Sequence, residues 1–238
     1  MAELNPTQEA VAPKIPELRE KFNKKFEKEI SAGVYDKRDL DRFASDDVYA
    51  GCFLRTMSAK GDTEKALDNV NECFKFRKEI GIHDLTEASF PAELKEKQNA
   101  IYYKGQDKQG HPILYVNVKE NTAKPEHQQA LKNFIAARFE EHQKVNPGQM
   151  AVVLMDMSGA STSNVSIDIS KYIISCFTHY FPSFLAYMIN YEMPMLLTGV
   201  WTIISAFLSG EQKKKLLVLK KKDIKNYIAD EHLWPHMK

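Results

Sequence analysis

The chain has 238 residues, of which 43% are hydrophobic and 27% charged, and its formal net charge is +1. This length can bury a substantial core, and this composition is close to the average of globular proteins, which excludes a disordered, fibrous or membrane-spanning class. A net charge so close to zero also argues against a nucleic-acid-binding protein. The first residues show no basic flank before an apolar stretch, so we expect no secretory signal and a cytosolic compartment.

Metal, cofactor and disulfide chemistry find little support in the sequence. Cys52, Cys73 and Cys176 are odd in number, far apart and in no CxxC pair, a pattern typical of buried reduced thiols. The seven histidines show no close metal-ligand spacing, and phosphate-binding loops, GxGxxG and HExxH motifs are absent. We therefore predict a protein without metal or cofactor.

The N-terminal part of the chain is predicted to be helical. Residues 1–16 contain three prolines and little periodicity, which favours a flexible leader. A helix is expected from about Glu17 to Ile30. We assign residues 17–90 to a helical segment and residues 91–238 to a second, larger domain.

Two further helices are predicted from capping residues and apolar periodicity. Ser45 is expected to cap a helix whose core-facing side carries Ala50, Phe53, Leu54 and Met57. Asp62 is expected to cap the next one, and Gly81 is a typical residue just beyond its end. The core-facing side of that helix comprises Ala66, Leu67, Val70, Cys73, Phe74 and Arg77.

From about residue 101 the pattern changes to strands alternating with helices. A β-hairpin around Gly110 is predicted, with a nearly continuous apolar strand over Met150–Met157 that is typical of a central, covered strand. The remaining elements are helices over 126–144 and 169–180 and strands over 187–192 and 215–219. This alternation predicts an α/β fold with a mainly parallel sheet covered by helices.

The segment Met193–Gly210 contains no charged residue and is apolar around its whole circumference. A helix of about 14 residues rises only about 21 Å, too short for a hydrocarbon core of about 30 Å. Two interpretations remain open from composition: a buried core helix, or a helix that closes a lipid cavity and touches a membrane.

Seven lysines between Glu211 and Lys225 give that segment a charge of +5. Two groups of lysines flank a predicted short strand, and they are either solvated residues at the sheet ends or residues that face an anionic membrane. The membrane-facing candidates are Lys213, Lys214, Lys220, Lys221 and Lys222.

An α/β-hydrolase-like enzyme is a rival interpretation. Its candidate residues are Asp156, Ser158, Ser161 and His179. Asp156 follows the predicted central strand, where such enzymes place carboxylates, but an Asp there also bonds backbone amides of the next loop, and we expect this structural role. The nearest approach to a nucleophile elbow is 159–163, which ends in Ser rather than Gly, so we interpret it as a loop.

Several motifs, in order, resemble the CRAL-TRIO family of lipid-binding domains from about Tyr35 to Pro235. They are Asp46–Arg55, Glu64–Leu67, Phe76–Glu79, the hairpin Lys104–Pro112, His179–Pro182, Glu192–Pro194, Phe207–Leu208 and Tyr227–Ile228. The resemblance implies an N-terminal helical segment followed by a CRAL-TRIO domain with a hydrophobic pocket floored by the sheet.

The same resemblance assigns the sites. The implied pocket residues are Val153, Met155, Ile173, Phe177 and Lys215, of which Lys215 matches the family's headgroup lysine. The implied gate helix comprises Pro194, Met195, Leu197, Gly199, Trp201, Ile204, Phe207 and Leu208, with Pro194 and Gly199 as bending points.

Other positions that recognise the lipid headgroup in family members carry different residues in this sequence. Ser183 and Phe184 stand where phosphatidylinositol-binding members have Glu and Arg, and Ala151 and Val153 align with the Ser and Thr that face phosphatidylcholine. We therefore expect a hydrophobic lipid ligand without predicting selectivity for inositol lipids.

The setting implied by the resemblance is a membrane surface. We expect a monomer that is not an enzyme and that carries lipid at the cytoplasmic face of a membrane or on a lipid droplet. The endoplasmic reticulum, membrane contact sites and a place within a longer anchored protein are part of this expectation. The alternative is a recruitment module that does not transfer lipid.

Overall fold

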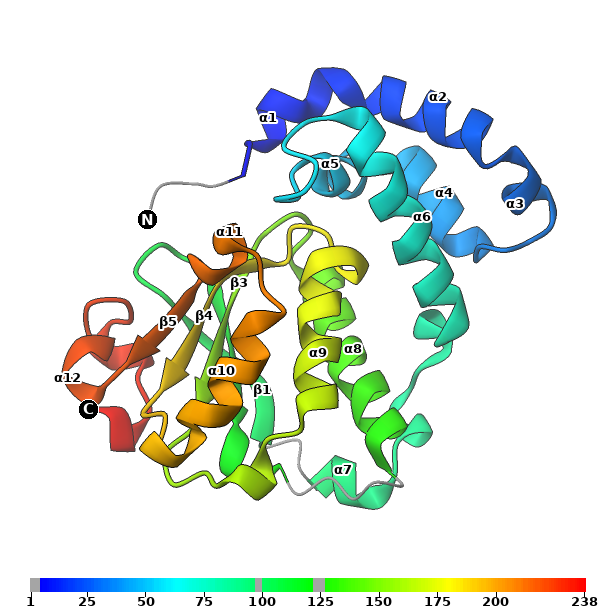
Figure 1. Ribbon diagram of the computed structural model, residues 1–238. Coiled ribbons are helices and arrows are strands. Elements are labelled where there is room, and N and C mark those ends of the chain that lie inside the picture. The colour runs from blue at the N-terminus through cyan, green and yellow to red at the C-terminus, as the bar shows by residue number, and fades with distance from the viewer. Residues whose placement is uncertain (1–4, 97–99, 122–126) are drawn as a thin grey trace. The chain divides into compact units, whose positions relative to one another are not determined.

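The computed structural model describes residues 5–96, 100–121 and 127–238 (Figure 1). The chain divides into two compact units. Unit 1 comprises Met1–Leu85, Phe139–Gly148 and Ser175–Phe184, and unit 2 comprises Thr86–Arg138, Gln149–Ile174 and Leu185–Lys238. This division differs from the expected linear boundary after residue 90, because two segments from the second half of the chain belong to unit 1.

The helical part of unit 1 begins earlier than the sequence predicts. The first elements are α1 (Gln8–Val11), the 3₁₀-helix η1 (Ala12–Lys14), α2 (Ile15–Lys25) and α3 (Glu27–Ser31). Val11 and Ile15 are buried, so the expectation of a flexible leader is wrong for this stretch. Pro13 and Pro16 each lie in the first turn of a helix, where the missing N–H leaves no hydrogen bond unmade. Residues 1–4 of the expected leader lie outside the described residues.

Unit 1 continues with α4 (Lys37–Ser45), α5 (Asp47–Leu54) and α6 (Thr63–Glu79). The cap of α5 is Asp46, whose side chain accepts from the Tyr49 N–H, and not Ser45, whose hydroxyl donates to Asp41 O. Asp62 caps α6 as predicted, its carboxylate accepting from two backbone N–H groups. Gly81 follows with φ of 61°, in the left-handed region that glycine adopts at little cost. The expected core-facing residues of α6 are all buried.

Aromatic rings fill the core among these helices. Phe22 packs against Phe43 and Phe74 with ring centroids 5.3 and 5.7 Å apart, both edge-to-face. After α9 (Ile167–Ser175) comes η8 (Cys176–Tyr180), a π-helical turn, and Tyr180 stacks on Phe76 at 3.8 Å. All three cysteines are free and buried, as expected.

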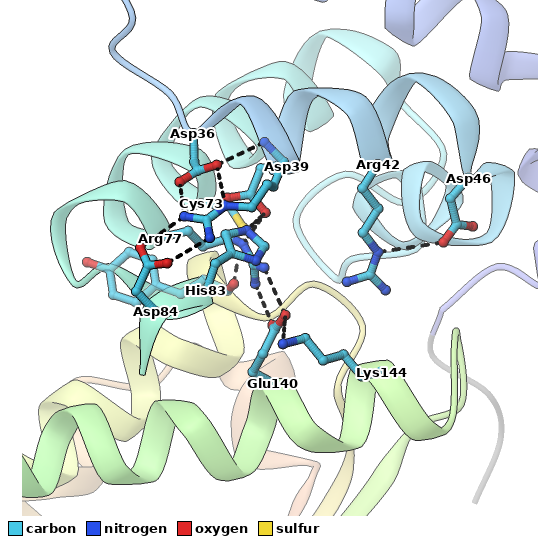
Figure 2. Close-up of polar contacts among 12 residues, drawn as sticks. Asp36, Asp39, Arg42, Asp46, Cys73, Arg77, His83, Asp84, Glu140 and Lys144 are labelled. Atoms are coloured by element: carbon cyan, nitrogen blue, oxygen red, sulfur yellow. Dashed lines mark hydrogen bonds and ion pairs between the residues drawn. The ribbon is translucent and has the colours of Figure 1, made fainter. Parts of the chain in front are cut away.

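Arg77 of α6 lies in a buried ion-pair network (Figure 2). Its Nε donates to Asp39 Oδ1 at 2.7 Å, and its Nη1 and Nη2 donate to the two oxygens of Glu140 at 2.7 and 3.0 Å. The side chains of Arg77 and Asp39 are 0% exposed and that of Glu140 is 4% exposed. Glu140 belongs to α8 (Gln128–Val145), whose expected start at Glu126 lies outside the described residues. The network therefore links α4, α6 and the C-terminal part of α8.

Unit 2 is built on a five-stranded sheet in the order β1-β2-β3-β4-β5. The strands are β1 (Ile101–Gln106), β2 (Pro112–Asn117), β3 (Ala151–Asp156), β4 (Leu185–Tyr191) and β5 (Leu216–Leu219). β1 and β2 form the predicted antiparallel hairpin, and the other three pairings are parallel. The expected mixed α/β class with a mainly parallel sheet is confirmed.

One face of the sheet, which we call the closed face, is covered by the C-terminal segment after β5. That segment includes α12 (Lys221–Ile224) and the 3₁₀-helices η10 (Asp230–His232) and η11 (Pro235–Met237). Sheet and C-terminal segment share one cluster of buried residues, which comprises Ile113, Tyr115, Val152, Leu154, Tyr187, Ile189, Tyr191, Leu219, Ile224, Ile228, Leu233, Trp234 and Met237.

The opposite face, which we call the helix face, lies on the side of α8, α9 and α10 (Figure 1). The connecting elements of unit 2 are the 3₁₀-helices η3 (Glu87–Ser89), η5 (Val118–Glu120) and η7 (Thr162–Asn164), and the short helix α7 (Ala92–Glu96). Unit 1 also contains η2 (Ile82–Asp84). The helix face carries the candidate site.

Candidate functional site

Side chains of the helix face form two rows across the strands. Strand register places Val153 beside Leu114 and Met188, with Leu216 next to Met188. The second row is Val116, Met155, Asn190 and Val218. Whereas the closed face is sealed, Val116, Met155, Met188 and Leu216 are only half-buried and Val218 is 48% exposed. An apolar surface with incomplete cover therefore lies on this side of the sheet.

The segment above this surface is the expected gate. It consists of the 3₁₀-helix η9 (Met195–Leu197) and α10 (Thr198–Ala206). Leu197 of η9 is buried in a cluster with Val118, Met157 and Ala160, against which Val116 and Met155 of the sheet pack. By contrast, none of the nine residues of α10 is buried. The helix is attached at its start and only loosely covered along its length.

The hydroxyl protons of this segment are bonded within the helix. Thr198, Thr202 and Ser205 each donate their side-chain hydroxyl to a backbone carbonyl one turn earlier, at 2.7, 2.9 and 3.0 Å. Such bonds satisfy a hydroxyl without water. These hydroxyls therefore offer no free donor on the outside of α10, although their oxygens can still accept.

Large apolar side chains on this segment are exposed. Met195 is 87% exposed, Leu196 58% and Phe207 48%, whereas Trp201 and Ile204 are half-buried. The Lys171 ammonium of α9 lies 4.4 Å from the centroid of the Phe207 ring. Phe207 is the residue directly after α10. Movement about Pro194 and Gly199 stays a prediction.

Lys215 is a buried cation just before β5. It is 8% exposed, and its Nζ donates to Leu185 O at 2.7 Å. Within the described ranges, no carboxylate lies within ion-pair distance of it. Burial lowers the pKa of Lys215 to about 8 because nothing offsets the loss of water around the charge. A buried ammonium without a counter-ion is suited to receive an anionic group.

The other candidate lysines form two separate groups. Lys213 and Lys214 are exposed at the end of α11 (Gly210–Lys213), close in sequence to α10. Lys220 follows the other end of β5 and pairs with Glu192 at 3.2 Å, and the Lys221 ammonium donates to His236 O. Lys222 is exposed beside them. Lys215 and the four residues of β5 lie between the two groups.

Ile173 and Phe177, which were both expected in the pocket, lie in different units. Ile173 is half-buried on α9 in unit 2. Phe177 belongs to unit 1, where it lies 5.1 Å from the Phe139 ring and 5.6 Å from that of Phe184. The helical periodicity that grouped the two residues continues through η8, but the chain passes from one unit to the other at residue 175.

Asp156 has the structural role expected for it. Its carboxylate accepts from Tyr115 Oη at 2.7 Å and from the Ser158 N–H at 3.0 Å, and His236 Nε2 lies 2.7 Å away. Burial raises its pKa, but these hydrogen bonds outweigh burial and leave the pKa below its ordinary value.

The other residues of the hydrolase interpretation have their own partners. His179 Nδ1 lies 2.8 Å from Glu72, and the Ser161 hydroxyl bonds with Ser163 and Asn164. In the part of the chain that the structure describes, neither Ser158 nor Ser161 hydrogen-bonds to a histidine. The geometry gives no support to a nucleophile activated by an imidazole.

Sequence reasoning missed Asn190. It is 1% exposed and lies on the helix face between Met155 and Val218. The signal was present, because alternation along the strand places residue 190 on the same face as Met188, so a polar side chain interrupts an apolar row.

The described residues contain no helix that is both long enough and apolar enough to cross a membrane. Nor do the described ranges bring together three or more His, Cys, Asp or Glu side chains in a group able to hold a metal ion.

Known proteins resemble this chain in sequence and in fold. A family model described as the CRAL/TRIO domain matches residues 96–237, more than half of the chain. The chain belongs to this family. The CRAL-TRIO domain-containing protein C3H8.02 of Schizosaccharomyces pombe is 28% identical over 133 residues, and the phosphatidylinositol transfer protein CSR1 of Eremothecium gossypii is 26% identical over 133 residues.

The two matches span about half of this chain and less than a third of each CRAL/TRIO relative. They cover 54% and 55% of this chain but only 30% of each relative. The crystal structure of Sfh5 covers 92% of this chain and 82% of its own, with a TM-score of 0.66 and 14% identity. At that identity the likeness establishes the fold alone.

Proposed function

We propose that the chain binds one lipid molecule non-covalently against the helix face of the sheet, with η9 and α10 as a movable cover. The observation that carries this proposal is the combination of an uncharged, largely apolar α10, in which no residue is buried, with a half-buried apolar sheet surface. Membership of the CRAL/TRIO family and the name of the phosphatidylinositol transfer relative support it.

The hydrophobic effect provides the reason for binding. Removing one large apolar side chain from water stabilises a state by about 1.5–3 kcal/mol. Acyl chains against Val116, Met155 and Met188 would complete the burial of the sheet surface and of the inner side of α10. A ligand pocket of this kind is mostly apolar with a few polar groups that fix orientation.

Lys215 is the polar group that we assign to an anionic headgroup. An anion beside its ammonium would supply the counter-ion that the described residues do not provide. Selectivity for inositol is not part of the proposal. Ser183 donates its hydroxyl to Cys52 O at 2.8 Å and Phe184 is 1% exposed in an aromatic cluster, so both have structural roles within unit 1.

Membrane docking is the second half of the proposal. Exposed Met195, Leu196 and Phe207 would enter the interfacial layer of a bilayer or the surface of a lipid droplet. Exposed Lys213 and Lys214 would add attraction to anionic lipids. Docking would lower the free energy of moving α10 outward, so the membrane itself would favour the open state.

The cellular setting rests on resemblance. The segments Tyr35–Asp39, Phe76–Ile80 and Glu192–Pro194 resemble the N-terminal CRAL-TRIO domain of motile-sperm-domain-containing protein 2, which is anchored in the endoplasmic reticulum. We propose that this chain works at the cytoplasmic face of that membrane or at contact sites and lipid droplets. A tagged chain that stays diffuse in cells rich in droplets and in endoplasmic reticulum would contradict this.

Native mass spectrometry of the purified chain tests ligand binding. We expect a mass shift that corresponds to one acyl-chain lipid, with the lipid identified after solvent extraction. Only ligand-free protein after mild purification would count against the proposal.

A recruitment module without transfer is the alternative function. The exposed apolar residues of η9 and α10 favour it independently, because they could bind a surface without opening anything. Exchange of a fluorescent lipid between donor and acceptor vesicles separates the two. Liposome binding without exchange would select recruitment, and turnover of a lipid ester that depends on Asp156 would instead indicate an enzyme.

A further inference from the structure

Asn190 is a polar side chain in the apolar floor of the candidate site. It lies in β4 with 1% of its surface exposed, between Met155 of β3 and Val218 of β5 on the helix face. Met188, two residues earlier on the same strand, faces the same side. Every neighbour in register is therefore apolar.

The amide of Asn190 is poorly satisfied by the protein. An asparagine side chain offers two N–H donors and a carbonyl oxygen with two lone pairs. Among the described residues, its one side-chain hydrogen bond runs from Nδ2 to Leu217 O at 3.4 Å, at the long end of the accepted range. A buried amide with most of its capacity unused is unfavourable unless another molecule completes it.

Asn190 and Lys215 mark two different positions along the strands. The Lys215 ammonium bonds to Leu185 O at the start of β4, and Asn190 lies five residues further along that strand. At about 3.3 Å per residue the backbone of Asn190 lies about 16 Å along β4 from Leu185. An acyl chain that runs along the strand from an anionic group bound at Lys215 would reach Asn190 with its middle part.

We propose that Asn190 is a specificity-determining residue that hydrogen-bonds an uncharged oxygen, a hydroxyl or carbonyl, within the hydrophobic part of the bound lipid. The inference rests on the proposed function. It deepens that function by naming the ligand class, namely anionic lipids whose chain carries an oxygen in its middle region. A saturated or simple unsaturated chain would still bind, but it would leave the amide unsatisfied.

Competition between oleic and ricinoleic acid tests this directly. The two fatty acids have the same carboxylate and chain length, and ricinoleic acid adds one mid-chain hydroxyl. The delipidated full chain is incubated with both at equal concentration, and the bound fraction is quantified by native mass spectrometry. One additional hydrogen bond predicts a preference for ricinoleic acid of about three- to tenfold.

Variants assign the preference to the amide. Asn190→Leu, similar in shape and without hydrogen-bonding groups, is expected to bind both acids about equally, and Asn190→Ala serves if the leucine variant does not fold. Asn226→Leu is the matched control, because Asn226 is exposed on the chain segment behind the closed face. It should keep the preference of the wild type.

The possible results are distinct. Equal binding of both acids by the wild type, or a preference that survives in the Asn190 variants, overturns the role of Asn190 while leaving lipid binding in place. Failure of the wild type to bind either acid overturns the proposed function and this inference together.

Discussion

Replacing Arg77 by methionine should destabilise the protein far more than replacing a surface arginine that also pairs with two carboxylates. In the Arg77→Met variant, the fully buried Asp39 and the nearly buried Glu140 lose their buried cationic partner. Among the described residues, Asp39 keeps only His83, 2.9 Å away, and Glu140 keeps only Lys144, 3.7 Å away. Removing one partner of a buried ion pair typically destabilises by about 3–5 kcal/mol, because the remaining charge is left without compensation. Two carboxylates are affected here and each keeps one remaining partner, so we expect a loss of stability within that range.

The matched control is Arg38→Met. Arg38 also bonds two carboxylates, Asp36 and Asp84 at 2.7 Å each, but its side chain is 49% exposed. Exposed ion pairs contribute about 0–1 kcal/mol. Urea unfolding followed by circular dichroism measures both variants. Equal shifts of the two midpoints would refute the argument that burial makes the Arg77 network important.

The pH dependence gives this prediction a second readout. Burial raises the pKa of Glu140, but the hydrogen bonds from Arg77 outweigh burial and hold the pKa below its ordinary value of 4.5. A carboxyl with a depressed pKa contributes stability that is present above about pH 4.5 and lost as the pH falls. In Arg77→Met the effect of burial dominates, so the sign reverses and this carboxyl should favour unfolding as the pH rises. An unchanged pH profile of the variant would contradict the mechanism.

Three further predictions concern the site. Burial lowers the pKa of Lys215 from 10.5 to about 8, so the charged form disfavours folding at neutral pH, and this penalty is relieved as the pH rises from about 8 towards 10.5. Because the ammonium loses its charge over that range, binding of an anionic lipid should weaken. In a vesicle-binding assay, Lys215→Met should remove this pH dependence. Replacing Trp201 and Phe207 together by Asp should leave the circular dichroism spectrum nearly intact while abolishing liposome binding and lipid exchange, and an unfolded variant would place these side chains in a static core. Replacing Lys213 and Lys214 by Gln should weaken binding to phosphatidylserine-containing liposomes by about 1 kcal/mol per lysine at low salt, and binding that ignores salt and phosphatidylserine content would remove them from the docking surface.

Local sequence signals predicted most of the fold, because the residues that define each of these elements lie within the element or next to it. The apolar run of β3, the turn at Gly110 and the cap at Asp62 depend on neighbours within a few residues. The helix α4 was not predicted, although Asp36 caps it, because its sequence is dominated by charged residues. The buried residues of α4 are Asp39 and Phe43, and the sequence around them has no apolar stripe with helical periodicity.

The candidate site was only partly predictable for the same reason. The apolar character of residues 193–210 could be read from the chain, whereas Lys215 was assigned only through the family resemblance, and its role in the site stays a prediction. The pairing of Arg77 with Glu140, 63 residues away, and the transfer of Phe177 into unit 1 depend on long-range packing. The amide of Asn190 required the strand register before its apolar neighbours on both sides became evident.

The two faces of the sheet differ in how much they can be altered. On the closed face, residues such as Ile113, Val152 and Ile189 are 0% exposed, so a change of one methylene there would be felt throughout a close-packed layer. On the helix face, Val116 and Met155 retain free surface. Substitutions there can change the room for a guest molecule with little penalty to the scaffold. If the helix face binds a lipid as proposed, mutations on that face can change the preferred ligand while the closed face maintains the fold.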